Sequence, residues 1–437
     1  MHAALSRLTL RRSCARAPST LAVWFHGGGF KEGSSAGPFD LYDGSKLVQR
    51  HGVIVVSCNY RLGALGALVH EGGLEGNYGF LDQRACLRWV QAEIGAFGGD
   101  RTRVTAWGQS AGAQSVLLHM ASNRSAGLFH RAVLESAPDL SLFTAHEARR
   151  LGAEVAKKAG CAHTSATATA ECLRTIDVDA LQSAASAAEA SLFGELSSLS
   201  LARPTASFLP FKPHVDGTDL TEQPFAALVA GRAPAAVPTL IGFNHDEMWA
   251  LMSGLPGWVG KLGVGAALSA LFGLPTAVRA TKHYEKLYPS DESSAALKIL
   301  TDYIFTCSSQ AVALALPSPS FVYQYNHIDS FGPELFGRFG LAQCASRACH
   351  EAEIPLVFGN MGPASFNISL TPDEAAISAT LQAAVTAVAK GGAPVGWPPF
   401  TSAARRGLVI NQTAAAVPLG EAANVCTAIW DRSGYVH

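Results

Sequence analysis

The sequence predicts an α/β protein whose mostly parallel central sheet is flanked by helices. Three observations lead to this fold class. Short apolar runs such as residues 53–57 (VIVVS) contain no charged residue, which is typical of strands buried on both faces of a sheet. Helical patterns lie between these runs, as in residues 83–93 (QRACLRWVQAE). Apolar side chains make up 48% of the 437 residues, enough for one large core.

Six short apolar runs are the predicted strands. In chain order they are residues 21–25, 53–57, 104–107, 132–134, 239–242 and 321–325. The helix predicted at residues 83–93 places Leu87, Trp89, Val90 and the following Ile94 mostly on one face. Residues 145–201 are rich in Ala and Ser and are also predicted to be helical. Strands and helices that alternate in this way favour a parallel sheet.

We expect residues 21–437 to form a single domain with helical insertions, preceded by an atypical segment, residues 1–20. Chain length alone suggests roughly three domains of about 150 residues each. The predicted strands, however, are spread along the chain, without a repeat or a long linker. Residues 1–20 contain four arginines and no acid, which fits either an organelle transit segment or an atypical start, and we favour the second.

Charge and hydropathy exclude two classes of partner. Lys and Arg number 33 against 34 Asp and Glu, so the chain lacks the basic surplus typical of nucleic-acid binders. The most apolar long window, residues 248–274, contains Lys261 and is interrupted by Pro256 and several glycines. That composition is unsuited to a membrane span and favours a pocket wall or a lid. The oligomeric state is not predicted.

The sharpest chemical motif is Gly108-Gln109-Ser110-Ala111-Gly112, which fits the pattern G-x-S-x-G. It follows a predicted strand and opens a helix predicted from residue 113 to 119, which is the context that a strained nucleophilic serine requires. The positive end of that helix favours negative charge at the site. The motif indicates Ser110 as a nucleophile of the α/β-hydrolase type.

A second motif, residues 26–30 (HGGGF), directly follows the first predicted strand. Acyl transfer places negative charge on the former carbonyl oxygen, which needs fixed N–H donors nearby. Glycines let the main chain approach that oxygen closely. We assign the N–H groups of Gly28 and Gly29 as donors, with that of Ala111 as a third. Patterns typical of phosphate-binding loops are missing here.

A serine nucleophile needs a histidine base and an acid that orients the histidine. In α/β-hydrolases the acid follows the serine along the chain, and the histidine follows the acid. His350 lies beyond the last predicted strand and just before the apolar residues 354–359 (IPLVFG), where the base is expected. Asp246 and Glu247 both follow the strand at residues 239–242, and spacing alone does not distinguish them.

Cysteines and sequons bear on the compartment. Two local pairs could form disulfides, Cys161 with Cys172 and Cys344 with Cys349. The second pair lies beside His350 and could clip its loop; zinc is disfavoured because a second ligand pair is lacking. Cys58 and Cys86 lie on an apolar strand and an apolar helix face and are expected to be buried thiols. Glycosylation sequons occur at Asn123, Asn367 and Asn411.

The motifs together resemble the type-B carboxylesterase and cholinesterase family from about residue 21 onward. The resemblance rests on segments in the family's order: residues 26–30, 59–63 (NYRLG), 76–83 (GNYGFLDQ), 97–100 (FGGD), 104–112 (VTAWGQSAG) and 127–132 (GLFHRA). Residues 242–247 (GFNHDE) are similar to the family's acid-bearing stretch, whose last glutamate falls on Glu247. Residues 350–359 are similar to the stretch that carries the base.

The resemblance implies an α/β-hydrolase that cleaves carboxylic esters through Ser110, His350 and Glu247, with no metal or cofactor. The substrate would be a small ester with an apolar acyl or alcohol part. It also implies a disulfide between Cys161 and Cys172 and a secreted or secretory-pathway location. Alternatives are a non-catalytic cholinesterase-like adhesion or scaffold protein, or an inactive truncated product.

One departure from the family concerns the first strands of the sheet. Residues 1–20 match nothing in the segment that supplies those strands in the family. The first strands of the sheet are therefore expected to be missing. The strand at residues 53–57 would then be a bare apolar sheet edge.

Overall fold

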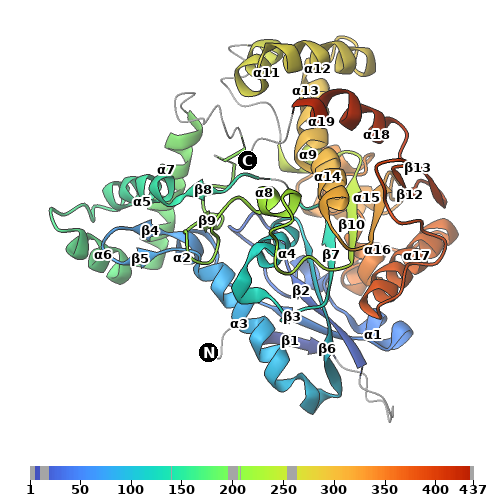
Figure 1. Cartoon of the computed structure of the whole chain (residues 1–437), viewed down its shortest axis with the longest axis horizontal. Helices are drawn as coiled ribbons and strands as arrows, with labels where there is room; N and C mark the ends of the chain where they lie inside the picture. Colours follow the sequence, from blue (N-terminus) through green and yellow to red (C-terminus); the bar gives the residue numbers. More distant parts are fainter. Residues whose placement is uncertain are drawn as a thin grey trace.

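A nine-stranded sheet forms the centre of the described part of the protein (Figure 1). The structure is a computed structural model that describes residues 5–9, 19–138, 140–194, 205–206, 208–252 and 263–433. Its strands are, in sheet order, β1 (Leu5–Thr9), β3 (Ile54–Cys58), β2 (Ser19–Phe25), β6 (Gly99–Gln109), β7 (Arg131–Glu135), β10 (Thr239–Asn244), β11 (Ser320–Tyr325), β12 (Arg406–Ile410) and β13 (Ala414–Pro418). Neighbours from β3 to β12 are parallel, and the two edge strands are antiparallel. The predicted mostly parallel sheet is confirmed.

The sheet is covered on both faces because its strands alternate two apolar sets of side chains. In β2, Ala22 and Trp24 belong to one core cluster, while Leu21, Val23 and Phe25 belong to another. The first cluster includes α1 (Ser45–His51), α16 (Ile354–Phe358) and α17 (Pro372–Ala389). The second includes α3 (Tyr78–Glu93), α4 (Ala111–Ala121), α8 (Pro224–Val229) and α14 (Cys307–Ala315). Apolar runs without charged residues are therefore buried on both sides, as their composition indicates.

Two groups of helices extend this core (Figure 1). At the left, α5 (Ala145–Lys158), α6 (Ala166–Thr175) and α7 (Val178–Gly194) pack with α2 (Gly63–Ala67) around a core cluster of their own. At the top lie α11 (Val264–Phe272) and α12 (Leu274–Leu287), followed by α13 (Glu292–Thr301). The predicted helical stretch at 145–201 is helical up to residue 194, and its remainder lies outside the described residues. So does the middle of the apolar window 248–274, at residues 253–262.

Short elements complete the chain and connect the larger ones. They are β4 (Val69–His70), β5 (Leu74–Glu75), β8 (Phe143–Thr144), β9 (His214–Val215), α9 (Glu247–Leu251), α15 (Gly332–Arg338), α18 (Glu421–Val425) and α19 (Asp431–Ser433). Within the part of the chain that the structure describes, no helix combines the length and the apolar character that a membrane crossing requires.

The expectation of a bare sheet edge at β3 is wrong. The strand β1 pairs with β3 in antiparallel register, from Leu5 opposite Cys58 to Thr9 opposite Val55. Residues inside the atypical segment thus supply an edge strand that covers the backbone of β3. A parallel strand needs a long crossover connection, usually a helix, whereas an antiparallel strand does not. A short stretch that matches none of the family's motifs can therefore supply β1.

The expectation that Cys58 and Cys86 are free thiols is also wrong. Both are buried, as predicted, but they form a disulfide between β3 and α3, with their Cα atoms 6.5 Å apart. The packing of α3 on this face of the sheet brings the two positions together, although they are 28 residues apart in sequence. A further disulfide, between Cys307 and Cys426, joins α14 to the segment that follows α18.

Candidate active site

Ser110 lies in a sharp turn between β6 and α4. Its backbone has φ 55° and ψ −125°, a conformation that non-glycine residues rarely adopt. The turn closes because both flanking glycines are in tight contact: a Cβ at Gly112 would lie 2.0 Å from the carbonyl oxygen of Phe25. The Ser110 N–H donates to the Glu135 carbonyl at 2.8 Å, which anchors the turn to β7. Ser110 is buried, with 7% of the residue exposed.

Glu247 and His350 meet although they are 103 residues apart. The Nδ1 of His350 donates to Oε2 of Glu247 at 2.5 Å, and the other carboxylate oxygen accepts from the Asn244 N–H at 2.7 Å. Asp246 instead contacts His245, at 3.0 Å. Of the two acids that spacing left open, the structure therefore places Glu247 on the imidazole.

The loops that carry these two residues are joined directly to each other. The Asp246 N–H donates to the Ala348 carbonyl at 2.9 Å, and the Asn244 side chain donates to the Cys349 carbonyl at 2.8 Å. Cys349 also forms a disulfide with Cys344, which closes a short loop immediately before His350. Contacts between the two loops thus restrain the Glu247–His350 pair in addition to its own hydrogen bond.

Gln109 is a site residue that sequence reasoning missed. The side-chain amide of Gln109 donates through Nε2 to Nε2 of His350 at 3.1 Å. This is the imidazole nitrogen that would accept a proton from the serine. The structure brings Glu247 to His350 and Gln109 to His350. Among the described residues, the Ser110 hydroxyl has no hydrogen bond to the imidazole. The motif pattern leaves this position unspecified, so only its place next to Ser110 could have drawn attention to it.

Burial and neighbouring carboxylates set the charge of His350. Burial lowers the pKa of the imidazole, but the charge and hydrogen bond of Glu247, together with Glu351 and Glu353, raise it above its ordinary 6.5. Burial, followed by the charge of Glu247, also raises the pKa of Glu353 to about 7. Asn244 donates to this carboxylate at 2.5 Å. Motif reasoning gave no role to either Glu353 or Asn244, because both act through neighbours rather than at the reacting atoms.

The glycine loop lies against the serine. A Cβ at Gly27 would be 2.9 Å from Cβ of Ser110. Gly28 and Gly29 have φ of 99° and 61°, and a Cβ at Gly28 would lie 2.1 Å from the Glu32 carbonyl oxygen, so the loop requires glycine here. Within the described residues, the N–H groups of Gly28, Gly29 and Ala111 donate to no other protein group. These three N–H groups are the donors expected for an anion beside Ser110.

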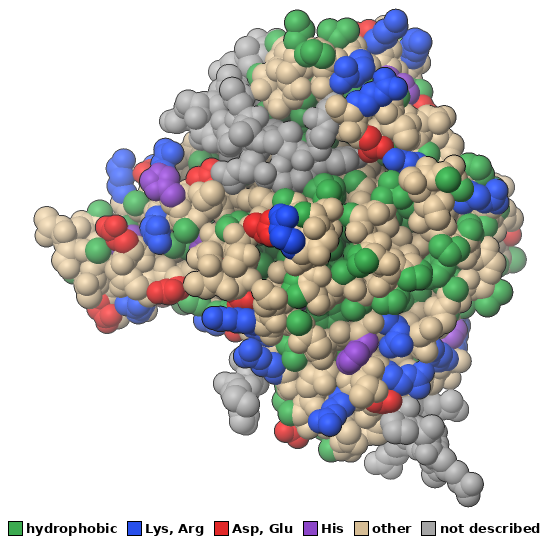
Figure 2. All heavy atoms as spheres, in the orientation of Figure 1, with side chains coloured by type: hydrophobic (Ala, Val, Ile, Leu, Met, Phe, Trp, Pro, Cys, Tyr) green, Lys and Arg blue, Asp and Glu red, His purple; other side chains and the backbone are tan. Residues whose placement is uncertain are grey.

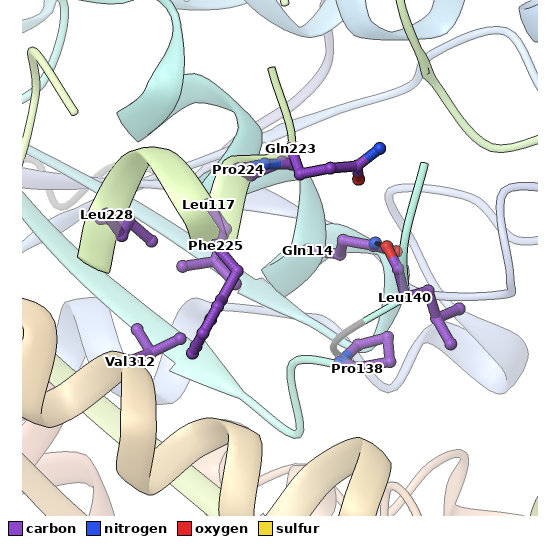
Figure 3. Close-up of a pocket in the computed structure, with 9 residues that line it drawn as sticks. All are labelled: Gln114, Leu117, Pro138, Leu140, Gln223, Pro224, Phe225, Leu228 and Val312. Carbon is purple, nitrogen blue, oxygen red and sulfur yellow. Dashed lines mark hydrogen bonds between the residues drawn. The ribbon is translucent and has the colours of Figure 1, made fainter. Parts of the chain in front are cut away.

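A small apolar cavity of about 20 Å³, little more than the space of one water molecule, lies further along α4 (Figure 3). Gln114 and Leu117 of α4 face Phe225 and Leu228 of α8, with Val312 of α14 below them. In the space-filling view, apolar side chains gather on the surface around α8 and α14 (Figure 2). This pocket is not formed by the apolar window 248–274 that the sequence singled out.

Comparison with known proteins places the chain. The sequence model of the carboxylesterase family matches residues 13–261 and 272–428. The chain belongs to the carboxylesterase family. Its curated relatives include the crystal protein of Dictyostelium discoideum, which is 34% identical over 80% of this chain and 61% of its own length. The cholinesterase of Mus musculus is 32% identical over 90% of this chain and 66% of its own length.

A bacterial esterase and a solved esterase structure are also similar to the chain. The para-nitrobenzyl esterase of Bacillus subtilis (strain 168) is 31% identical over 89% of this chain and 75% of its own length. A solved PNB esterase superposes with a TM-score of 0.75 at 28% identity, covering 94% of this chain and 82% of that one. The chain thus spans about 61% of its first curated relative and more of the bacterial esterase. The predicted α/β-hydrolase fold and family resemblance are confirmed.

Proposed function

We propose that the protein hydrolyses carboxylic esters through a covalent acyl-serine intermediate. Ser110 is the nucleophile, His350 the base and Glu247 the acid that orients the imidazole. The observation that carries this proposal is the hydrogen bond between His350 and Glu247 beside a serine in a strained turn. Membership of the carboxylesterase family and the likeness to PNB esterases support the reaction class.

The first chemical step forms the acyl-enzyme. The Ser110 oxygen attacks the ester carbonyl carbon while Nε2 of His350 takes the hydroxyl proton, for which the Gln109 amide must leave Nε2. The carbonyl oxygen becomes an anion that the N–H groups of Gly28, Gly29 and Ala111 bind. The carbon–oxygen bond to the alcohol then breaks, and the imidazolium returns its proton to the departing alkoxide.

The second step releases the acid and restores the enzyme. Water attacks the acyl carbon as Nε2 takes one of its protons, and the same amides hold the second oxyanion. Collapse expels the Ser110 oxygen, which regains its proton from His350. Glu247 stays ionised throughout and stabilises the imidazolium. The proposed substrate is an ester with an apolar acyl or alcohol part.

Covalent labelling tests the proposed nucleophile. We expect a fluorophosphonate probe to label the protein on Ser110 and short-chain aryl esters to be cleaved. Ser110→Ala should abolish labelling and lower kcat by about 10⁶-fold, by the precedent of other serine hydrolases. The matched control is Ser293→Ala on the exposed side of α13. A folded, monodisperse protein without Ser110-dependent labelling would support the adhesion or scaffold alternative instead.

We further propose that the protein folds in the secretory pathway. Disulfides form and persist in oxidising compartments, and four are present within the described residues. The asparagines of the three sequons, Asn123, Asn367 and Asn411, are exposed, as glycan attachment requires. Production in a cell with a secretory pathway should give a species that loses mass on treatment with an endoglycosidase, whereas Asn→Gln substitution at all three positions should abolish that loss.

A further inference from the structure

Three side chains of metal-binding type meet outside the candidate active site. His327 and Asp329 follow β11, and Glu374 lies in the first turn of α17. Their exposed fractions are 8%, 3% and 0%. One ligand atom from each lies within 4.8 Å of the others. Two segments that are distant in sequence therefore bring an imidazole and two carboxylates to one buried point.

Two atoms in this cluster lack hydrogen-bond partners. The Nε2 of His327 and the Oδ2 of Asp329 are both buried and neither makes a hydrogen bond. Other buried polar atoms of the described residues also lack a partner, but here two of them belong to one cluster of metal-ligand side chains, where an ion would satisfy both. The two carboxylates are buried close together, so their negative charges repel each other. A ligand that supplies positive charge and accepts lone pairs would remove both costs.

The surrounding hydrogen bonds hold the carboxylates in place. The Tyr325 hydroxyl donates to the other oxygen of Asp329, Oδ1, at 2.5 Å. Glu374 accepts from the Ser330 N–H at 2.6 Å and the Thr371 N–H at 2.7 Å. Metal-binding carboxylates are characteristically oriented by outer hydrogen bonds of this kind.

We propose that His327, Asp329 and Glu374 bind a divalent transition-metal ion, with Zn²⁺ as the best fit. An imidazole ligand favours such ions over Ca²⁺ or Mg²⁺. Ligands at about 2.0–2.1 Å from a tetrahedral Zn²⁺ lie roughly 3.3 Å apart. Nε2 of His327 and Oε1 of Glu374 are 3.6 Å apart, so this pair needs little adjustment. The two negative charges balance the ion, and a fourth ligand position is left for water.

The bound ion would stabilise the fold and would take no part in catalysis. It joins the end of β11 to the first turn of α17. Tyr325, the last residue of β11, pairs with Asn244, and its carbonyl accepts from the His245 N–H at 3.0 Å. The ion would therefore stabilise the sheet end from which Glu247 projects, without touching substrate.

Metal titration of the whole protein tests the proposal. Protein stripped with a chelator is titrated with Zn²⁺ while the thermal midpoint is followed, and with Co²⁺ while its visible d–d absorption is recorded. We expect one equivalent to bind and the thermal midpoint to rise with Zn²⁺ concentration. Absence of a stoichiometric site in the wild-type protein overturns the proposal without any variant.

Variants then locate the ion. Asp329→Asn should weaken metal affinity at least about tenfold and remove the rise in thermal midpoint. The matched control is Asp302→Asn, because Asp302 is also buried and also accepts from a tyrosine hydroxyl, that of Tyr284 at 2.8 Å. Lys298, at 3.0 Å, already neutralises it. If Asp329→Asn does not fold, His327→Gln replaces it. Unchanged affinity in the variant places the ion elsewhere and overturns the proposal.

Discussion

At the scale of single residues, the charge on His350 decides when the candidate active site can work. Only the neutral imidazole can accept the Ser110 proton, and Glu247 helps to raise the imidazole pKa above 6.5 despite its burial. The rising limb of kcat/KM against pH should therefore lie above pH 6.5. Glu247→Gln removes the largest raising influence, so the limb should move to lower pH while kcat falls by about 10⁴. A pH profile of kcat/KM for both proteins checks this, and an unmoved limb contradicts the assignment.

Gln109 should influence the same limb from the other side of the ring. Its amide lies 3.1 Å from Nε2 of His350. Gln109→Glu places a carboxylate there, which stabilises the imidazolium and raises its pKa. The limb should then move to higher pH, opposite to its movement in Glu247→Gln. Gln109→Leu is the neutral control, and an alkaline movement in both variants would mean that charge is not the cause.

Residues with unusual chemistry could be predicted from sequence, whereas their supports could not. Ser110, His350 and the glycines stand out because few residue types perform their tasks at such spacings. Spacing does not distinguish Asp246 from Glu247. Which of two adjacent side chains points toward His350 depends on tertiary contacts that the position in the sequence does not encode. Gln109 and Glu353 are ordinary residue types that gain importance only from the side chains that folding brings beside them.

At the scale of elements, the disulfide between Cys344 and Cys349 restrains the loop that presents His350. Both cysteines are buried, and the Cys349 carbonyl accepts from Asn244. Replacing both by serine should let the imidazole drift, so kcat should fall by up to about 10²-fold while KM changes little. The paired replacement of Cys161 and Cys172 is the matched control, because that disulfide lies among α5–α7. Equal kcat values in the two double variants would show that the disulfide between Cys344 and Cys349 does not position His350.

The six apolar runs all became strands, but β1, β12 and β13 were not predicted. The runs were visible because strands buried on both faces need unbroken apolar sequence. By contrast, β13 is mostly exposed or half-buried, and β12 begins with the exposed Arg406. The edge strands β1 and β13 are held by backbone pairing with one neighbour each, which leaves little trace in side-chain composition.

At the scale of the whole molecule, β1 protects one margin of the sheet. It pairs along β3, whose side chains are buried throughout. A variant lacking residues 1–10 should expose the β3 backbone, so it should self-associate and unfold at a lower temperature than the full chain. Light scattering over a concentration series and a thermal melt measure both effects. A truncated protein that stays monomeric with an unchanged midpoint would show that β3 needs no partner.

The bonds between the two loops that carry Glu247 and His350 have a consequence for motion. Asn244 and Asp246 are bonded to Ala348 and Cys349, whereas Ser110 is anchored separately to β7. Local opening should therefore release the two loops together as one cooperative unit. In a deuterium-exchange time course, the backbone amides of residues 244–247 and 348–353 should share one opening free energy, distinct from that of the Ser110 turn. The base and its acid would then separate from the nucleophile before they separate from each other.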